Sequence, residues 1–202
     1  MFYITKGSEP GELTTFRQNI INQKKTYDWN DCPIQVKNAI RKKLVLEQNG
    51  LCAYCTREIG EDCQIEHFYS RNQYSQKMFD YDNMLGVDNS KKVDYRFKGI
   101  CENGRGSKSL TLSPLDQTLM NGIYYLSDGT IKHDLFQNDL DNVLHLNHNV
   151  FKMARKNLLK AVKARMPYCN INTLISTYET EPYGGIVVYY LNRLKKNPNF
   201  QM

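Results

Sequence analysis

The sequence predicts an α+β protein in which a small metal-stapled core is embedded in a mainly helical chain that carries an extra β-hairpin. Three observations support this class. Cys52 and Cys55 form a Cys-X-X-Cys pair, and Cys101 follows downstream. The segment 63–69 is short, β-prone and flanked by polar runs, as a strand is. Most of the remaining chain repeats apolar residues at helical spacing.

Composition and charge set limits on the class of protein. The 202 residues include 27 Lys and Arg, 21 Asp and Glu and 41% hydrophobic residues, for a net charge of +6. This composition can bury a core and excludes a disordered chain. Residues 150–202 hold nine Lys or Arg against two Glu, so they carry +7 and residues 1–149 carry −1. A basic end on a neutral body favours a polyanion as partner.

The chain shows no pattern of membrane insertion or secretion. Its start has no secretory signal and no apolar run approaches the length of a membrane span. We therefore expect a cytoplasmic protein with no membrane partner. Six cysteines are too few for a disulfide scaffold in a chain of this length, so metal binding or catalysis better explains the clustered ones.

The first half of the chain predicts short elements. A helical piece is expected over 13–23 after the break at Pro10 and Gly11. Val36, Ile40 and Leu44 recur at helical spacing and predict a helix over 33–49. A strand over 63–69, one helical turn over 81–85 and a charged loop over 88–99 are expected next.

The second half predicts a hairpin and long helices. Asp128 and Gly129 supply the turn between strands over 123–126 and 129–132. A helix capped by Asn149 is expected over 149–165, and a partly buried helix over 185–196. The first of these has an apolar face made of Phe151, Ala154, Leu158 and Ala161.

The helix over 149–165 also carries the candidate nucleic-acid surface. Its basic residues are Lys152, Arg155, Lys156, Lys160 and Lys163. Lysines at spacings of three and four can follow a phosphate backbone. A solvated helix face explains the lysines equally well, and Arg155 could instead line a pocket.

The clustered cysteines predict a structural zinc site. Two thiolates three positions apart on a tight turn reach one tetrahedral centre, and Cys101 supplies a third ligand. Asp88, Cys63 and a histidine are the candidates for the fourth. A redox dithiol is the alternative, but that use places the pair between a strand and a helix, whereas Cys52 and Cys55 follow a helix.

Glu66 and His67 stand side by side in the predicted strand. A carboxylate is a hard metal ligand and an imidazole a general base, so the pair could form one catalytic point. The alternative is a buried Glu and a core histidine, each satisfied by hydrogen bonds. Neighbouring strand residues point to opposite faces, so both can serve one site only where the strand ends or distorts.

The order of these features resembles a known family. Segments 52–55, 65–68, 81–85 and 101–106 look like the zinc-stapled HNH (ββα-metal) endonucleases. More narrowly, the chain is similar to the PtuB-type HNH subunits of Septu and retron-associated anti-phage systems, a likeness that spans nearly the whole chain. It implies an HNH core with its zinc site over 51–115, between an N-terminal arm and helix over 1–50 and a basic hairpin and helical region over 116–202.

The resemblance also implies roles for individual residues. His67 would be the general base, Glu66 the acidic metal ligand and Asn83 the residue that holds the catalytic loop. A histidine often follows the cysteine at position 101 in relatives, whereas Glu102 and Asn103 stand here. Asn103 is the expected second metal ligand, with Glu102 as the alternative. The zinc site would be Cys52, Cys55, Asp88 and Cys101, with Asp88 where relatives commonly have cysteine.

The function that the resemblance implies is phosphodiester hydrolysis. The chain would be an endonuclease that uses Mg²⁺ or Mn²⁺ and acts on DNA or tRNA. It would be the effector of an anti-phage complex with an SMC- or ABC-like ATPase of the PtuA type, and a retron RNA or DNA could be a further partner. The alternative is a catalytically inactive, zinc-stapled nucleic-acid-binding or assembly module, which the departures at Glu102 and Asp88 favour.

Overall fold

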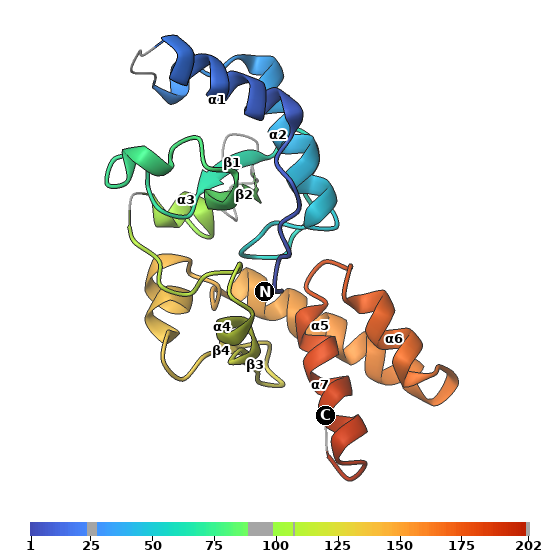
Figure 1. Ribbon diagram of the computed structural model, residues 1–202. Coiled ribbons are helices and arrows are strands. Elements are labelled where there is room, and N and C mark those ends of the chain that lie inside the picture. Colours follow the sequence, from blue (N-terminus) through green and yellow to red (C-terminus); the bar gives the residue numbers. More distant parts are fainter. Residues whose placement is uncertain (24–27, 89–98, 107, 201–202) are drawn as a thin grey trace.

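A computed structural model describes residues 1–23, 28–88, 99–106 and 108–200 and shows a mixed α+β chain (Figure 1). The helices are α1 (Gly11–Gln23), α2 (Ile34–Glu47), α3 (Glu102–Arg105), α4 (Gln117–Asn121), α5 (Asn149–Arg165), α6 (Ile171–Tyr178) and α7 (Gly185–Lys196). The strands are β1 (Gln64–His67), β2 (Met84–Val87), β3 (Tyr124–Tyr125) and β4 (Ile131–Lys132), paired as two separate two-stranded sheets. The predicted α+β class is confirmed.

Helices α1 and α2 pack together, and α2 also packs on the β1–β2 sheet. Its buried residues are Val36, Ile40 and Leu44, the three whose spacing predicted it. The helix ends at Glu47, two residues before the predicted end. Asn49 and Gly50 have positive φ angles of 53° and 71°, a backbone conformation that terminates helices.

Strands β1 and β2 are antiparallel, with Glu66 opposite Leu85 and His67 opposite Met84. The predicted strand over 63–69 is confirmed at its centre. The helical turn expected over 81–85 is wrong in its second half, because Met84 and Leu85 belong to β2. Both side chains are fully buried, so pairing across the sheet prevails over local helical spacing. The charged loop expected over 88–99 lies outside the described residues except at its ends.

The predicted hairpin is confirmed and is seated on α5. Strands β3 and β4 pair around a turn in which Gly129 has a φ of 90°. A Cβ atom on Gly129 would lie 2.1 Å from the backbone oxygen of Lys152, so the turn touches the helix backbone. Arg155 Nε donates a hydrogen bond to Gly129 O at 2.6 Å, which fixes the hairpin against α5.

Helix α5 has the predicted bounds, but two details were wrong. The side chain of His148, rather than Asn149, accepts the hydrogen bond that caps its start. The buried residues are Phe151, Arg155, Leu159 and Val162, so the core-facing stripe is shifted from the apolar face expected at 154, 158 and 161. Arg155 occupies a core position because backbone carbonyls satisfy its guanidinium.

The last two helices complete the C-terminal part. Helix α7 has the predicted bounds and packs on α5, α6 and β3. Its early apolar residues, Ile186 and Val187, are fully buried. Helix α6, capped by the Asn170 side chain, was not predicted as a separate element. Among the described residues, no helix is both long and apolar enough to cross a membrane.

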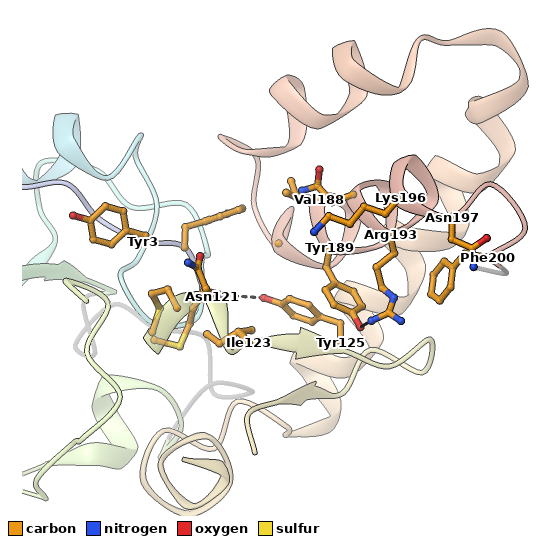
Figure 2. A pocket seen from close by; sticks show the side chains of 15 residues that line it. Tyr3, Asn121, Ile123, Tyr125, Val188, Tyr189, Arg193, Lys196, Asn197 and Phe200 are labelled. Atoms are coloured by element: carbon orange, nitrogen blue, oxygen red, sulfur yellow. Dashed lines mark hydrogen bonds between the residues drawn. The ribbon is translucent and has the colours of Figure 1, made fainter. Parts of the chain in front are cut away.

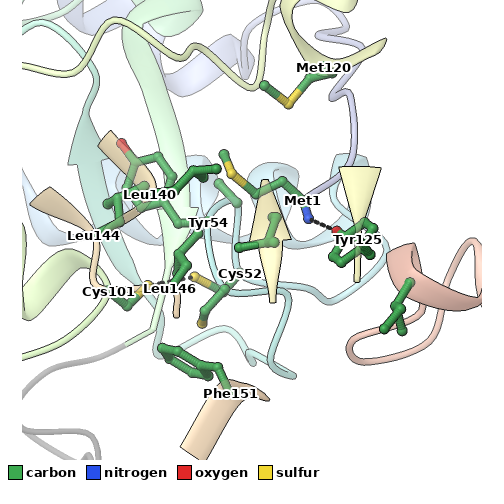
Figure 3. Close-up of a cluster of buried hydrophobic side chains, with 14 of the residues drawn as sticks. Met1, Cys52, Tyr54, Cys101, Met120, Tyr125, Leu140, Leu144, Leu146 and Phe151 are labelled. Atoms are coloured by element: carbon green, nitrogen blue, oxygen red, sulfur yellow. Dashed lines mark hydrogen bonds between the residues drawn. The ribbon is translucent and has the colours of Figure 1, made fainter. Parts of the chain in front are cut away.

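Two hydrophobic clusters hold the elements together. The smaller one joins α1, α2 and the sheet through residues such as Leu13, Ile40 and Met84. The larger one surrounds the Cys52–Cys55 turn and extends through the hairpin to the C-terminal helices (Figure 3). The cysteine turn therefore lies where the N-terminal and C-terminal parts of the chain meet.

Candidate functional site

Three cysteine thiols meet in the larger core. Cys52 and Cys55 lie on the turn after α2, and Cys101 lies just before α3. Their sulfur atoms are all within 4.8 Å of one another, and the three residues are buried. The Cys52 and Cys101 sulfurs are 3.7 Å apart. Two ligands of a tetrahedral zinc with Zn–S bonds of about 2.3 Å would be about 3.8 Å apart, so the thiols fit a metal such as zinc.

The surroundings of the thiols favour a closed structural site. Figure 3 shows Cys52 and Cys101 among Tyr54, Leu146 and Phe151, which are all buried. Cys101 adopts a positive φ of 58°, and its N–H donates to Leu144 O at 2.7 Å. This strained position turns the third thiol toward the first two.

The charge state of the thiols is unequal. Burial raises the pKa of Cys101 well above its usual range. Burial also opposes ionisation of Cys55, but hydrogen bonds from the thiols of Cys101 and Cys52, with the Arg57 charge, hold the pKa of Cys55 well below its usual range. One thiolate is therefore favoured without metal, and a divalent cation would be needed to ionise the others.

The expected fourth zinc ligand is not with the thiols. Among the described His, Cys, Asp and Glu residues, the group contains Cys52, Cys55 and Cys101 alone. Asp88 instead forms an ion pair with Arg57. Cys63, the other candidate cysteine, is buried outside the group. The prediction that Asp88 is the fourth zinc ligand is therefore wrong, because its carboxylate pairs with the Arg57 guanidinium and does not join the thiols.

A separate cavity of about 280 Å³ lies between the end of β1, the loop after it and α3. Its lining residues are Gln64, Ile65, Glu66, His67, Ser70, Arg71, Asn72, Arg105 and Gly106. The sheet and α3 lie side by side in Figure 1, which brings residues 64–72 next to 105–106. The cavity therefore contains both members of the predicted Glu66–His67 pair.

His67 is buried and oriented by a backbone carbonyl. Its Nε2 lies 2.9 Å from Met78 O, and its ring meets the edge of Trp29 at a centroid distance of 4.6 Å. A carbonyl can only accept, so Nε2 carries the proton and Nδ1 is the basic nitrogen. Burial first, and then the charges of Arg71 and Arg105, lower the pKa of His67 to about 4 despite the Met78 bond. The imidazole is neutral at pH 7.

Glu66 is paired with a buried arginine. Arg105, with 2% of its surface exposed, forms an ion pair with the Glu66 carboxylate through Nη1. The same guanidinium donates to Tyr54 Oη at 3.0 Å, to the carbonyls of His67 and Phe68 and to Lys108 O at 3.0 Å. These bonds tie α3 to the end of β1 and fix the carboxylate at the cavity wall.

Asn83 holds the loop after β1. Its Oδ1 accepts from Tyr69 N at 2.7 Å, and its Nδ2 donates to Tyr69 O at 3.0 Å and Lys77 O at 3.1 Å. The side chain is buried and does not line the cavity. Through these hydrogen bonds Asn83 fixes the backbone of the loop beside the cavity, which is a positioning role and not a reacting one.

Asn103 does not join Glu66 at the cavity. Asn103 is exposed, its Oδ1 accepts from Gly99 N at 2.9 Å, and it does not line the cavity. The side chain of Glu102 lies outside the described side chains. The position that we assigned to Asn103 is taken by Arg105, two residues further along, because α3 turns Arg105 inward.

Ser70, Arg71 and Arg105 are among the lining residues that were not predicted as site residues. Ser70 Oγ is buried and has no hydrogen-bond partner in the part of the chain that the structure describes. Arg71 and Arg105 add two positive charges to the cavity. Arg105 stands within the motif at 101–106, and Ser70 and Arg71 closely follow the Glu66–His67 pair, so proximity to the motif was the available signal.

The predicted basic surface on α5 is only partly present. Lys156, Lys160 and Lys163 are exposed. Lys152 pairs with Asp128 at 2.8 Å. Arg155 is buried and donates to backbone carbonyls, so its assignment to a nucleic-acid surface was wrong. Satisfied buried donors cannot contact a phosphate without breaking the fold.

A larger cavity, of about 620 Å³, lies between the first residues, β3 and α7 (Figure 2). Tyr125 and Tyr189 stand in it with ring centroids 6.0 Å apart, and Arg193 donates to Tyr189 Oη at 3.1 Å. None of its described lining residues has a carboxylate, imidazole or thiol side chain. Acid–base chemistry is therefore better placed at the smaller cavity.

No model of a known protein family matches the chain, and no curated protein matches it.

Proposed function

We propose that the chain is a metal-dependent endonuclease of the HNH type that hydrolyses phosphodiester bonds in DNA or tRNA. One observation supports this best. The 280 Å³ cavity holds the neutral imidazole of His67 and the carboxylate of Glu66 together with the guanidinium groups of Arg71 and Arg105. A proton acceptor, a carboxylate and two cations in one cavity are what hydrolysis of an anionic diester requires.

The residues of the cavity have different tasks. His67 accepts a proton from water at Nδ1, because the bond from Nε2 to Met78 O fixes the tautomer. Arg71 and the Ser70 hydroxyl bind phosphate oxygens, since both line the cavity and the described residues give the hydroxyl no hydrogen-bond partner. The negative phosphate raises the pKa of His67 when it binds, which makes the imidazole a stronger base.

In this proposal a catalytic divalent cation would be held through one protein carboxylate. Mg²⁺ is commonly bound by one or two carboxylates together with substrate phosphates, and Glu66 supplies one. When bound, such an ion polarises the phosphate and stabilises the leaving oxygen. Arg105 positions the Glu66 carboxylate for this contact through their ion pair.

The biological setting that we propose rests on the order of the sequence motifs alone. The chain would act in the cytoplasm as the effector subunit of an anti-phage complex with an SMC- or ABC-like ATPase, with a retron RNA or DNA as a further partner. The three-thiol group would hold a structural zinc ion that fixes α3 relative to the sheet.

A second function is favoured by a specific observation. Asn103 does not line the cavity and Glu66 is already paired with Arg105, so the set of metal ligands is smaller than the motif implies. A catalytically inactive, zinc-stapled nucleic-acid-binding module is therefore the alternative. The two differ in one measurable respect, because the alternative binds nucleic acid without cutting it under any divalent cation.

The test compares the wild type with His67→Gln in the presence of the ATPase partner and Mg²⁺, on plasmid DNA and on tRNA. We expect loss of cleavage by at least about a hundredfold, the low end of the contribution of a general base. His148→Gln, which changes an exposed histidine outside the cavity lining, is the matched control and keeps full activity, and its thermal unfolding checks that the changed cap of α5 leaves the fold intact. Equal cleavage by wild type and His67→Gln would overturn the role of His67, and binding without cleavage by the wild type would establish the alternative.

A further inference from the structure

Two exposed tyrosines lie beside the small cavity. Tyr69 is 41% exposed and Tyr74 is 38% exposed, and their ring centroids are 5.2 Å apart. The Lys77 ammonium lies 4.2 Å from the centroid of the Tyr69 ring. Two aromatic rings in mutual contact at the surface, beside a cation, present an apolar ring surface and a positive charge at one place.

The tyrosine pair is connected to the cavity by direct contacts. Tyr69 stands between the lining residues His67 and Ser70 in the chain. Its ring meets that of Phe68 edge to face at 5.1 Å, and the Arg105 guanidinium lies 5.9 Å from the Phe68 ring. The Phe68 ring thus links the Tyr69 ring to Arg105 in the cavity wall.

The pair is also held in place. The Asn83 side chain bonds both the N–H and the carbonyl of Tyr69. Further along the loop, Ser109 Oγ lies 3.3 Å from Gln73 Oε1. The Tyr69 backbone is thus fixed while its side chain stays partly exposed, which is the arrangement of a preorganised contact surface.

We propose that Tyr69 and Tyr74 form a stacking platform for an unpaired base next to the phosphate bound in the cavity, so that the substrate is single-stranded DNA or RNA, including unpaired loops. This inference rests on the proposed function of the cavity. A base within a duplex has both faces covered by its neighbours, so only an unpaired base can stack on an exposed ring. Lys77 and Arg71 supply charge for the phosphates on either side of it.

Trp29 provides a direct measure of binding at this place. It is the single tryptophan of the chain, and its ring lies 5.7 Å from the guanidinium carbon of Arg71, which lines the cavity. It also stacks on Phe79 at 5.9 Å, so it is fixed in position. A nucleic-acid strand that binds Arg71 changes the surroundings of the Trp29 indole and therefore the fluorescence of Trp29.

The experiment titrates the full chain with a single strand of about 12 nucleotides, as DNA and as RNA, and with the corresponding duplexes, without added Mg²⁺. Trp29 fluorescence and anisotropy of a labelled strand are recorded. We expect single strands to bind more tightly than duplexes, Tyr69→Ala to weaken single-strand binding about tenfold and Tyr69→Phe to restore it. The DNA and RNA arms identify which strand is preferred. Tyr168→Ala, at a tyrosine that is 87% exposed on the C-terminal part, is the matched control and leaves binding unchanged.

Three binding results would overturn the proposal: no binding of single strands at low salt, tighter binding of duplexes, or wild-type affinity in Tyr69→Ala. The last of these would assign the tyrosine pair to a protein contact. Thermal unfolding of each variant separates misfolding from lost stacking, and Tyr74→Ala, which removes the other ring of the pair, keeps the test valid if Tyr69→Ala is unstable. The readout needs no cleavage. If the chain binds single strands through Tyr69 but cuts no nucleic acid, the proposed function fails and the stacking platform stands. If it cuts duplex DNA and Tyr69→Ala cuts equally well, the stacking platform fails and the proposed function stands.

Discussion

The carboxamide of Asn83 forms two hydrogen bonds with the backbone of Tyr69: it accepts from the N–H at 2.7 Å and donates to the carbonyl at 3.0 Å. The two residues are 14 positions apart. Asn83 ends a turn before β2, and Tyr69 lies in the loop after β1. One buried side chain thus determines the path of the loop that carries Ser70 and Arg71 into the cavity.

Replacing Asn83 should therefore destabilise the loop and the site together. Asn83→Ala removes three hydrogen bonds and leaves the backbone groups of Tyr69 without these partners. We expect a loss of about 2–3 kcal/mol in the free energy of unfolding, measured by urea denaturation. Asn157→Ala, at an exposed position on α5, is the control and should change stability by less than about 0.5 kcal/mol. An unchanged urea midpoint for Asn83→Ala would contradict the assigned role.

Removing a thiol of the cysteine group should abolish metal binding. Elemental analysis of the wild type should find about one zinc per chain, and Cys52→Ser should contain almost none and unfold at lower temperature. Cys32→Ser is the matched control, because Cys32 is buried but lies outside the group. A chelator should lower the unfolding temperature of the wild type and of Cys32→Ser but leave Cys52→Ser unaffected. Equal zinc content in both variants would rule out this site.

The Arg105–Glu66 pair should show strong coupling in a double-mutant cycle. Arg105→Met leaves a partly buried carboxylate without this cation and should cost about 3–5 kcal/mol of stability. Adding Glu66→Gln removes that uncompensated charge, so the double variant should lose less than the sum of the two single variants. Calorimetry or urea unfolding gives the four free energies. Simple additivity would show that the pair does not interact in solution.

The exposed and buried basic residues of α5 should behave in opposite ways. Reversing the charge of Lys156, Lys160 and Lys163 should weaken nucleic-acid binding and flatten its dependence on salt, with little change in stability. Arg155→Gln should destabilise the fold, since Arg155 donates to Gly129 O and Leu146 O, and should leave the salt dependence unchanged. Binding titrations between about 50 and 200 mM salt separate the two effects. A salt slope that follows Arg155 instead would reverse this assignment.

Gly129 should not tolerate a side chain. Its φ is 90°, and an added Cβ would lie 2.1 Å from Lys152 O, so alanine cannot fit without displacement of the hairpin from α5. We expect Gly129→Ala to lower stability by more than about 2 kcal/mol in thermal or urea unfolding. Gly11→Ala is the control, because no atom lies within 4 Å of its added Cβ and alanine favours the helix. Similar stability of the two variants would show that the hairpin is not seated as described.

Local signals predicted several elements, with the bounds of α7 correct and the strands of the hairpin shorter than expected. The hairpin follows from Asp128-Gly129, and α7 follows from an apolar start and a basic end. Helix α5 was placed correctly, but its buried face was not. Counting Arg155 as a surface residue is reasonable from the sequence, because arginine is seldom buried; the carbonyls that satisfy it come from residues 9 and 26 positions away.

The site was predictable to a similar degree. The meeting of Cys52, Cys55 and Cys101 was inferred from spacing and order, and Glu66 and His67 lie at one cavity. Asn103 does not line the cavity and Asp88 does not join the thiols, because each side chain has another partner. The Gly99 N–H donates a hydrogen bond to Asn103 Oδ1, and Arg57 forms an ion pair with Asp88.

By itself, the sequence determined which residue types are available and the local geometry near them: a thiol pair on a turn, a carboxylate beside an imidazole, and helices with periodic apolar faces. Only the tertiary structure decided which partner each polar group has. A buried charge or amide must be satisfied by whatever donor or acceptor the fold brings within reach, and those partners are distant in sequence. Arg105 therefore stands beside Glu66, and Tyr69 remains exposed at the cavity, for reasons that no local pattern contains.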